Sequence, residues 1–215
     1  IGRDVGVAWS GDYSAQSLLQ DQACRNFANH ILWQSDPDCV LLRERFHELS
    51  EEEVKSLAIY AGMTGGVMIT SDHLGELSRD RLDLWRFILS EERASCDFPL
   101  LGRSDISYER QIVPGGQIRP VPRAADPVLV QVRHSRGVGT TGAILFLNTA
   151  SHTVQRSYPL VELGINYPVY LYHWKNGTAN DQTAVKISIT LAAHFSALYF
   201  FSLEPIRDLP LRLPS

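Results

Sequence analysis

The sequence has little of several features that would narrow its functional class. Three cysteines, Cys24, Cys39 and Cys96, occur in 215 residues, and they form no C-x-x-C pair. That spacing excludes a disulfide framework and favours free thiols that are buried or partly buried. Lysine and arginine number 20 against 24 aspartates and glutamates, without a basic stripe, so we expect no nucleic acid partner. Apolar runs stay below the ~18 residues of a membrane span, so we expect no membrane partner either.

Other signals are also missing. The chain opens with Ile1-Gly2-Arg3-Asp4, without an initiator methionine or a signal peptide, and this opening is typical of the tail of a strand. We therefore expect a fragment or a truncated product of a longer protein. The histidines lack the spacing of metal ligands, and we predict neither a metal nor a cofactor. The free cysteines slightly favour the cytoplasm, although the compartment is otherwise undetermined.

Residues 1–96 have the periodicity of an α/β unit. Helical spacing of apolar residues alternates with short apolar strands; we expect helices over 14–32, from Ser50 onward and over 78–89, and strands over 39–42 and 67–70. A capping box of Ser50 and Glu53 marks the start of the second helix. The strand-helix-strand order predicts that the strands are parallel.

Residues 97–215 have a different character. Helical periodicity stops, a stretch rich in proline, glycine and arginine follows, and the strands expected are 106–113, 128–133, 143–148, 153–160, 169–174, 185–191 and 197–203. Apolar and polar residues alternate along 185–191, which indicates an antiparallel sheet with one wet face. Asn176-Gly177 predicts a hairpin turn, and the tail 205–215 is expected to fray. We predict a β-sandwich that folds alone, whereas 1–90 alone would not.

Two aspartates in the first part are candidates for chemistry. Asp4 and Asp38 each follow or border a predicted strand and lie one strand-helix-strand step apart. Parallel strands end at the same edge of a sheet, where paired carboxylates suggest general acid/base work on a sugar. Two alternatives remain open for Asp4, which could cap a loop or pair with a nearby arginine. Asp36 precedes Pro37 and is predicted to be a structural turn residue.

Four ordered motifs carry a resemblance to a known family. They are 1–9, the Trp33 to Arg43 stretch that contains Asp-Pro-Asp, 49–54 and 65–74. Together they resemble the closing third of the melibiase-type alpha-galactosidases, glycoside hydrolase family 36 in particular. The resemblance implies that 1–96 is the C-terminal part of a (β/α)8 TIM barrel, incomplete in this chain, and that 97–215 is the antiparallel β-sandwich that follows it.

The resemblance also implies roles for individual residues. Asp4 would be the general acid/base, Asp38 and Cys39 would line the sugar subsite, and Asp72 would be a structural turn residue like Asp36. The family's nucleophilic aspartate lies upstream of the matched region, so no residue of this chain is assigned as nucleophile.

Two tryptophans complete the predicted site. Trp9 and Trp33 are candidates to stack on a sugar face, with packing inside the protein as an equal alternative for each. Neither residue type nor spacing decides between these roles.

We therefore expect a glycoside hydrolase of the alpha-galactosidase type. It would hydrolyse terminal alpha-linked galactosides or related glycosides with retention, by a double displacement between two aspartates. The chain alone would be inactive and would tend to associate through its incomplete barrel. The alternative is a non-hydrolytic carbohydrate-binding or accessory protein that uses its β-sandwich, where Tyr170, Tyr172 and Trp174 share one face.

Overall fold

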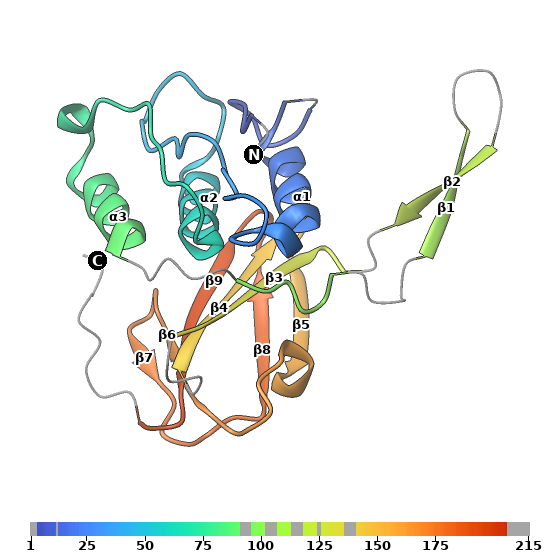
Figure 1. The fold of residues 1–215 in the computed structure, drawn as a ribbon, viewed down its shortest axis with the longest axis vertical. Helices are drawn as coiled ribbons and strands as arrows, with labels where there is room; N and C mark the ends of the chain where they lie inside the picture. The colour runs from blue at the N-terminus through green and yellow to red at the C-terminus, as the bar shows by residue number, and fades with distance from the viewer. Residues whose placement is uncertain are drawn as a thin grey trace.

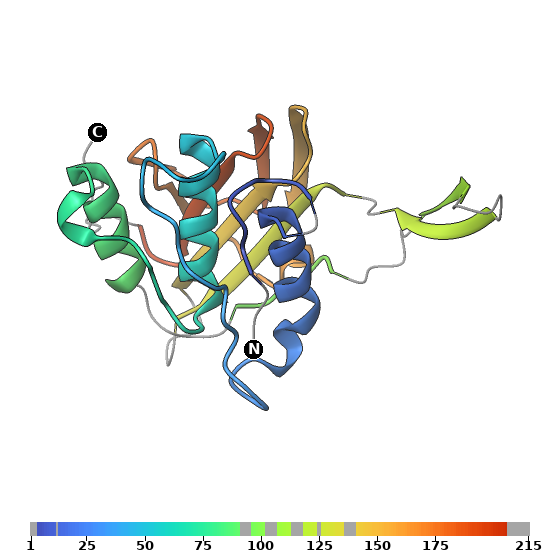
Figure 2. The same ribbon diagram turned by 90° about the horizontal axis from the view of Figure 1, so that it is seen from above.

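The protein combines helices with antiparallel sheets. The computed structural model describes residues 4–11, 13–90, 96–101, 107–112, 118–123, 126–135 and 141–205, with backbone alone for 90, 107–112 and 118–123. Three helices lie across one face of a five-stranded sheet, and a two-stranded sheet lies on the other face (Figure 1 and Figure 2). Among the described residues, no helix is long and apolar enough to cross a membrane.

Helix α1 (Ala15–Arg25) starts where the sequence predicts and ends early. Ser14 is its N-cap, and its hydroxyl forms a reciprocal capping box with Ser17. The prediction of helix as far as residue 32 is wrong, because α1 gives way to a single 3-10 turn, η1 (Asn26–Ala28).

Two asparagines account for the early end of α1. The Asn26 side chain donates to the Cys96 carbonyl at 2.6 Å. The Asn29 side chain donates to the Thr64 carbonyl at 3.1 Å and accepts from the Ser35 N–H at 2.8 Å. Side chains that bond the backbone of other segments compete with continuation of a helix. The chain therefore turns away after Ala28.

The second and third helices match their predictions. Helix α2 (Glu51–Thr64) begins with the expected capping box between Ser50 and Glu53 and ends at Gly65, whose φ of 70° is left-handed. Glycine adopts that conformation without the steric penalty of a Cβ. Helix α3 (Arg79–Ser90) follows and packs beside α2. The starts of both helices are local features, and local sequence predicted them.

The two short segments expected as parallel strands pair more briefly than predicted. Cys39 and Ile69 form one parallel bridge, and the Val40 N–H donates to the Ile69 carbonyl at 2.8 Å. Their direction is as predicted, but no regular strand forms. Asp38 adopts a left-handed φ of 61° at one end, and the Leu42 N–H donates to a side chain at the other. Both features interrupt the ladder of backbone bonds.

The C-terminal half is built from antiparallel strands. One sheet has the order β3-β4-β9-β6-β7, and β5 pairs with β8 in a second sheet. The bounds are β3 Val128–His134, β4 Thr141–Asn148, β5 Val154–Pro159, β6 Tyr170–His173, β7 Thr178–Ala179, β8 Lys186–Leu191 and β9 Ser196–Ser202, with the 3-10 turn η3 at Leu160–Leu163. Strand β8 alternates between exposed and buried residues as predicted. The Asn176-Gly177 turn joins β6 to the short β7, which the sequence did not reveal.

A separate hairpin projects from the body of the protein (Figure 1). It pairs β1 (Ser107–Ile112), which was predicted, with β2 (Ile118–Arg123), which was not. Strand β2 contains prolines at positions 120 and 122, and a proline is tolerated in a strand that has a free edge. The tail predicted to fray lies outside the described residues from position 206 onward.

Two hydrophobic clusters lie on opposite faces of the large sheet. Alternate residues of β4 and β9, including Leu145, Leu147 and Leu198, pack against α2 and α3. The residues between them, including Phe146 and Phe201, pack toward β5 and β8. The first cluster joins the two parts that the sequence analysis separated at 96/97. Independent folding of 97–215 remains a prediction, with the added expectation that this fragment exposes the helix-facing side of β4.

Candidate functional site

The Asp36-Pro37-Asp38 turn is held by local hydrogen bonds. Asp36 Oδ1 accepts from the Asp38 N–H at 2.9 Å, a bond between residues two positions apart that closes the turn. The Asp36 carbonyl accepts from Gln22 Nε2 of α1 at 2.6 Å. Asp38 has a φ of 61°, a conformation that aspartate tolerates better than most residues. The turn therefore aims the Asp38 carboxylate away from its own strand.

That carboxylate reaches the segment that carries Asp4. Asp38 Oδ2 accepts from the Val5 N–H at 2.8 Å, across 33 positions of sequence. Asp38 Oδ1 has no hydrogen-bond partner among the described residues, and the Asp4 side chain is exposed. Asp38 comes directly before the bridged residue Cys39, at the start of this segment and not beyond its carboxyl end. The bond to Val5, and not a shared strand end, brings the two predicted aspartates together.

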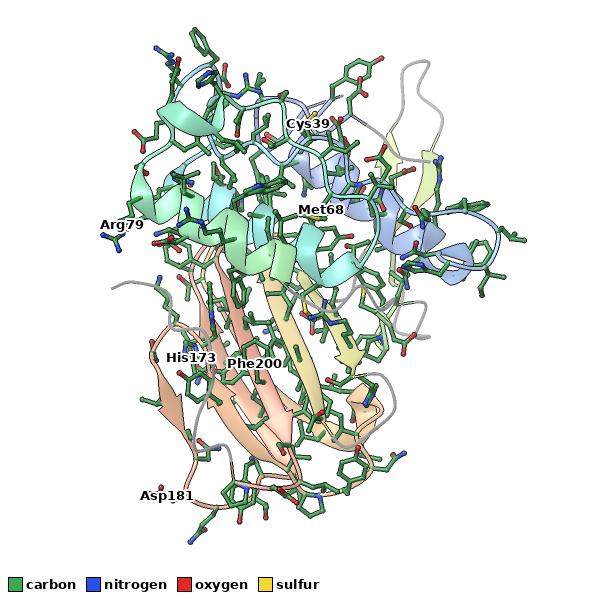
Figure 3. All side chains as sticks on the ribbon, turned by 60° about the vertical axis from the view of Figure 1, so that its left-hand side comes forward. Cys39, Met68, Arg79, His173, Asp181 and Phe200 are labelled. Atoms are coloured by element: carbon green, nitrogen blue, oxygen red, sulfur yellow. The ribbon has the colours of Figure 1, made fainter. Side chains whose placement is uncertain are left out.

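Cys39 lies beside this pair and faces an apolar region. It is half-buried, and Figure 3 shows it above Met68 in the helical half of the protein, far from Asp181 at the other end of the sheet. A cavity behind it has an almost wholly apolar lining: Val5, Leu18, Pro37, Cys39, Val40, Leu41, Leu49, Val54, Leu57, Tyr60 and Ala61. Such a lining suits packing of apolar side chains and offers few groups to a hydroxylated ligand.

Asp72 joins the two parallel segments at a second point. Its carboxylate is fully buried and accepts from the backbone N–H groups of Leu42 and Arg43, the latter at 3.0 Å. Asp72 Oδ1 also lies 2.7 Å from Arg43 Nε, and an Arg43 terminal nitrogen donates to Ser71 Oγ at 2.7 Å. Asp72 therefore joins the two segments and orients Arg43, which the sequence did not identify as a site residue.

The loop from Arg43 to Glu48 is held in place by further contacts. Arg45 pairs with Glu76 at 2.6 Å. The Leu49 N–H donates to His47 Nδ1 at 3.2 Å, so the proton of the neutral ring is on Nε2, which donates to the Arg43 carbonyl at 2.6 Å. We call residues 43–48 the rim loop. The local signal for it was the run of charged and aromatic residues directly after an apolar strand.

The predicted tryptophans have different surroundings. Trp9 is 9% exposed and stacks on His194, with 4.1 Å between ring centroids. His194 Nδ1 in turn contacts Glu53 Oε1. This favours the packing alternative for Trp9 over stacking on a sugar. Trp33 is half-buried and meets Phe27 edge to face at 6.4 Å, near the end of α1.

The three cysteines are free thiols with different exposures. Cys96 is buried, and burial raises the pKa of its thiol to about 12 although Gln131 Nε2 donates to it at 3.3 Å. It therefore stays protonated and unreactive near neutral pH. Cys24 is exposed, which corrects the expectation that all three are buried or partly buried.

The chain shares its fold with parts of several solved structures. No family model matches the chain. The chain is similar to a candidate alpha-galactosidase from Bacteroides fragilis, with a TM-score of 0.67 and 14% identity, covering 93% of this chain and 41% of that one. It is also similar to a GH27 β-L-arabinopyranosidase from Geobacillus stearothermophilus, with a TM-score of 0.64, 11% identity and coverage of 91% and 43%.

A third similar structure is an alpha-galactosidase from Saccharomyces cerevisiae with raffinose, at a TM-score of 0.60, 12% identity and coverage of 92% and 54%. This chain thus spans between about two fifths and just over half of these structures. At such identities the likeness shows that the chain has the fold of part of these proteins.

Proposed function

We propose that this chain is part of a glycoside hydrolase of the alpha-galactosidase superfamily and supplies one side of its active site. Asp4 acts as the general acid/base, and Asp38 holds the sugar in its subsite. Residues 1–96 are the closing part of a (β/α)8 barrel, and 97–215 form a β-sandwich after it. The substrates are terminal alpha-linked galactosides or closely related glycosides.

One observation carries the proposal. The bond from the Val5 N–H to Asp38 Oδ2 joins the residue after Asp4 to the second aspartate. It leaves Asp38 Oδ1 able to accept from a ligand hydroxyl beside the exposed Asp4 carboxyl group. The fold shared with glycoside hydrolases supports the same conclusion.

The proposed reaction uses two carboxyl groups with different roles. In its protonated form Asp4 would protonate the glycosidic oxygen as the bond to the leaving group breaks, and as a carboxylate it would then remove a proton from water. A second carboxylate, contributed from outside this chain, would attack the anomeric carbon and form the glycosyl-enzyme. Asp38 would hold the ring by accepting hydrogen bonds from its hydroxyls.

The test compares leaving groups in the intact protein that contains this chain. The Asp4→Asn variant should lose about 100-fold or more in kcat/KM on raffinose, because its leaving oxygen needs a proton. It should lose far less on galactosyl fluoride, since fluoride departs without one. Azide should restore turnover on the fluoride and release a galactosyl azide of retained configuration. Asp80→Asn, which removes an exposed carboxylate from α3, is the matched control, and equal losses on both substrates would remove Asp4 from the mechanism.

The alternative of a sugar-binding sheet has weaker support. Trp174 stacks on Phe87 of α3 at 4.4 Å between centroids, and His173 meets Tyr199 edge to face at 4.7 Å. These aromatics are engaged in packing. Saturable binding of galactosides to a protein with Asp4→Asn and Asp38→Ala together would favour this alternative.

A further inference from the structure

The rim loop lies beside the segment of Asp4. The Glu48 N–H donates to the Val7 carbonyl at 2.7 Å, so the end of the loop contacts a residue three positions after Asp4. Three residues span at most about 10 Å, which is within the length of a disaccharide, and Gly6 between Asp4 and Val7 has a φ of 66° that bends the chain. The loop is also continuous with the strand segment that follows Asp38. It therefore borders the proposed site.

One residue of the loop has an unfavourable conformation that the fold maintains. Phe46 has a φ of 65°, which is rare for a bulky side chain. Its side chain is 75% exposed, so burial of the ring does not offset the strain. The contacts of Arg43, Arg45 and His47 described above hold the backbone on both sides of it. Backbone strain that surrounding contacts impose in this way is concentrated at binding sites.

The exposed ring has the chemistry of a sugar platform. The Arg45 guanidinium lies 5.2 Å from the Phe46 ring centroid and restricts the orientation of the ring. The face of an aromatic ring carries partial negative charge, which attracts the polarised C–H groups on the apolar face of a pyranose. Arg43 donates one hydrogen bond from a terminal nitrogen to Ser71 Oγ, and its Nε forms an ion pair with Asp72 Oδ1. Its side chain is 30% exposed, so further donors can reach ligand hydroxyls.

We propose that the rim loop forms the subsite for the leaving group, with Phe46 stacking on the sugar ring next to the scissile bond and Arg43 donating to its hydroxyls. This inference rests on the proposed function and adds a substrate class to it. The preferred substrates are oligosaccharides whose leaving group is itself a sugar. Small leaving groups gain nothing from the loop.

Two substrates separate the subsite from the chemistry, again in the intact protein. Phe46→Ala should lower kcat/KM on raffinose about 3- to 10-fold, mainly through KM, since one aromatic contact is removed. It should leave galactosyl fluoride unchanged, because fluoride has no ring to stack. Phe46→Trp should retain the preference for raffinose. Val161→Ala, which shortens an exposed apolar side chain (62%) in η3 of the C-terminal half, should change neither substrate.

The outcomes are distinguishable. Equal losses of kcat/KM on both substrates would mean that Phe46 only supports the structure. No loss of kcat/KM on either substrate would also overturn the subsite. A wild-type protein that hydrolyses neither substrate would reject the proposed function and the subsite with it. Phe46→Gly gives a second readout. It relieves the strain at φ 65°, so its melting temperature should not fall while its raffinose preference is lost.

Discussion

The buried carboxylate of Asp72 should be the most sensitive single side chain in the site region. Asp72→Ala would leave the N–H groups of Leu42 and Arg43 without their acceptor and would remove the partner of the Arg43 guanidinium. The Asp72 side chain is fully buried, so water cannot reach the two N–H groups without local opening. All three interactions hold the end of one parallel segment against the other.

The expected loss of stability is large for one residue. Removing one partner of a buried, hydrogen-bonded charge pair costs about 3–5 kcal/mol, and each orphaned buried N–H costs about 1–3 kcal/mol. Because Arg43 is 30% exposed and can turn toward solvent, we expect a total near the lower figure, about 3 kcal/mol. Asp72→Asn, which keeps an oxygen for the backbone N–H groups, should cost about half as much.

Urea unfolding of the whole chain measures these losses, and a double-mutant cycle with Arg43→Gln isolates the pair. We expect a coupling of about 1–2 kcal/mol between Asp72 and Arg43. The matched control is the exposed pair Arg45–Glu76, whose side chains are 66% and 58% exposed. Glu76→Gln should cost less than about 1 kcal/mol. If Asp72→Ala were no more destabilising than this control, the view that Asp72 holds the two segments together would be wrong.

Two further predictions concern the fold. A Cβ at Gly66 would lie 2.0 Å from the Ser35 carbonyl oxygen. Gly66→Ala should therefore destabilise the chain by about 2 kcal/mol or more, measured by urea unfolding. Gly75→Ala is the control and should not destabilise the chain, because the nearest atom to its Cβ is a side-chain atom 3.3 Å away. Burial, aided by the Lys175 charge, lowers the pKa of His173 below 6.5 in the folded protein. The unfolded chain therefore binds the proton more tightly than the folded chain. The free energy of unfolding should then fall as the pH drops below about 6.5 and level off below the folded pKa. His173→Phe should weaken that dependence, and equal pH profiles would contradict it.

The helices show which boundaries can be predicted from local sequence. The capping boxes at Ser14 and Ser50 and the glycine cap at Gly65 each use groups within a few positions, and their positions were predictable. The end of α1 was not, because Asn29 bonds Thr64 and Ser35 of segments that meet it only in the folded chain. The single parallel bridge has the same origin, since the Asp72 carboxylate takes the Leu42 N–H that a regular strand would use.

The same distinction between local sequence and tertiary contacts applies to the site. By itself, the sequence determined the turn at Asp36-Pro37-Asp38, because an aspartate before proline bonds a backbone N–H two residues on. It also identified Asp4 and Asp38 as candidates. Only the tertiary structure decided that Asp38 bonds Val5, that Trp9 packs on His194, and that Phe46 is held outward in a strained conformation. Each of these depends on contacts between distant segments, and such contacts have no local signature because residue type and spacing do not specify which segments meet.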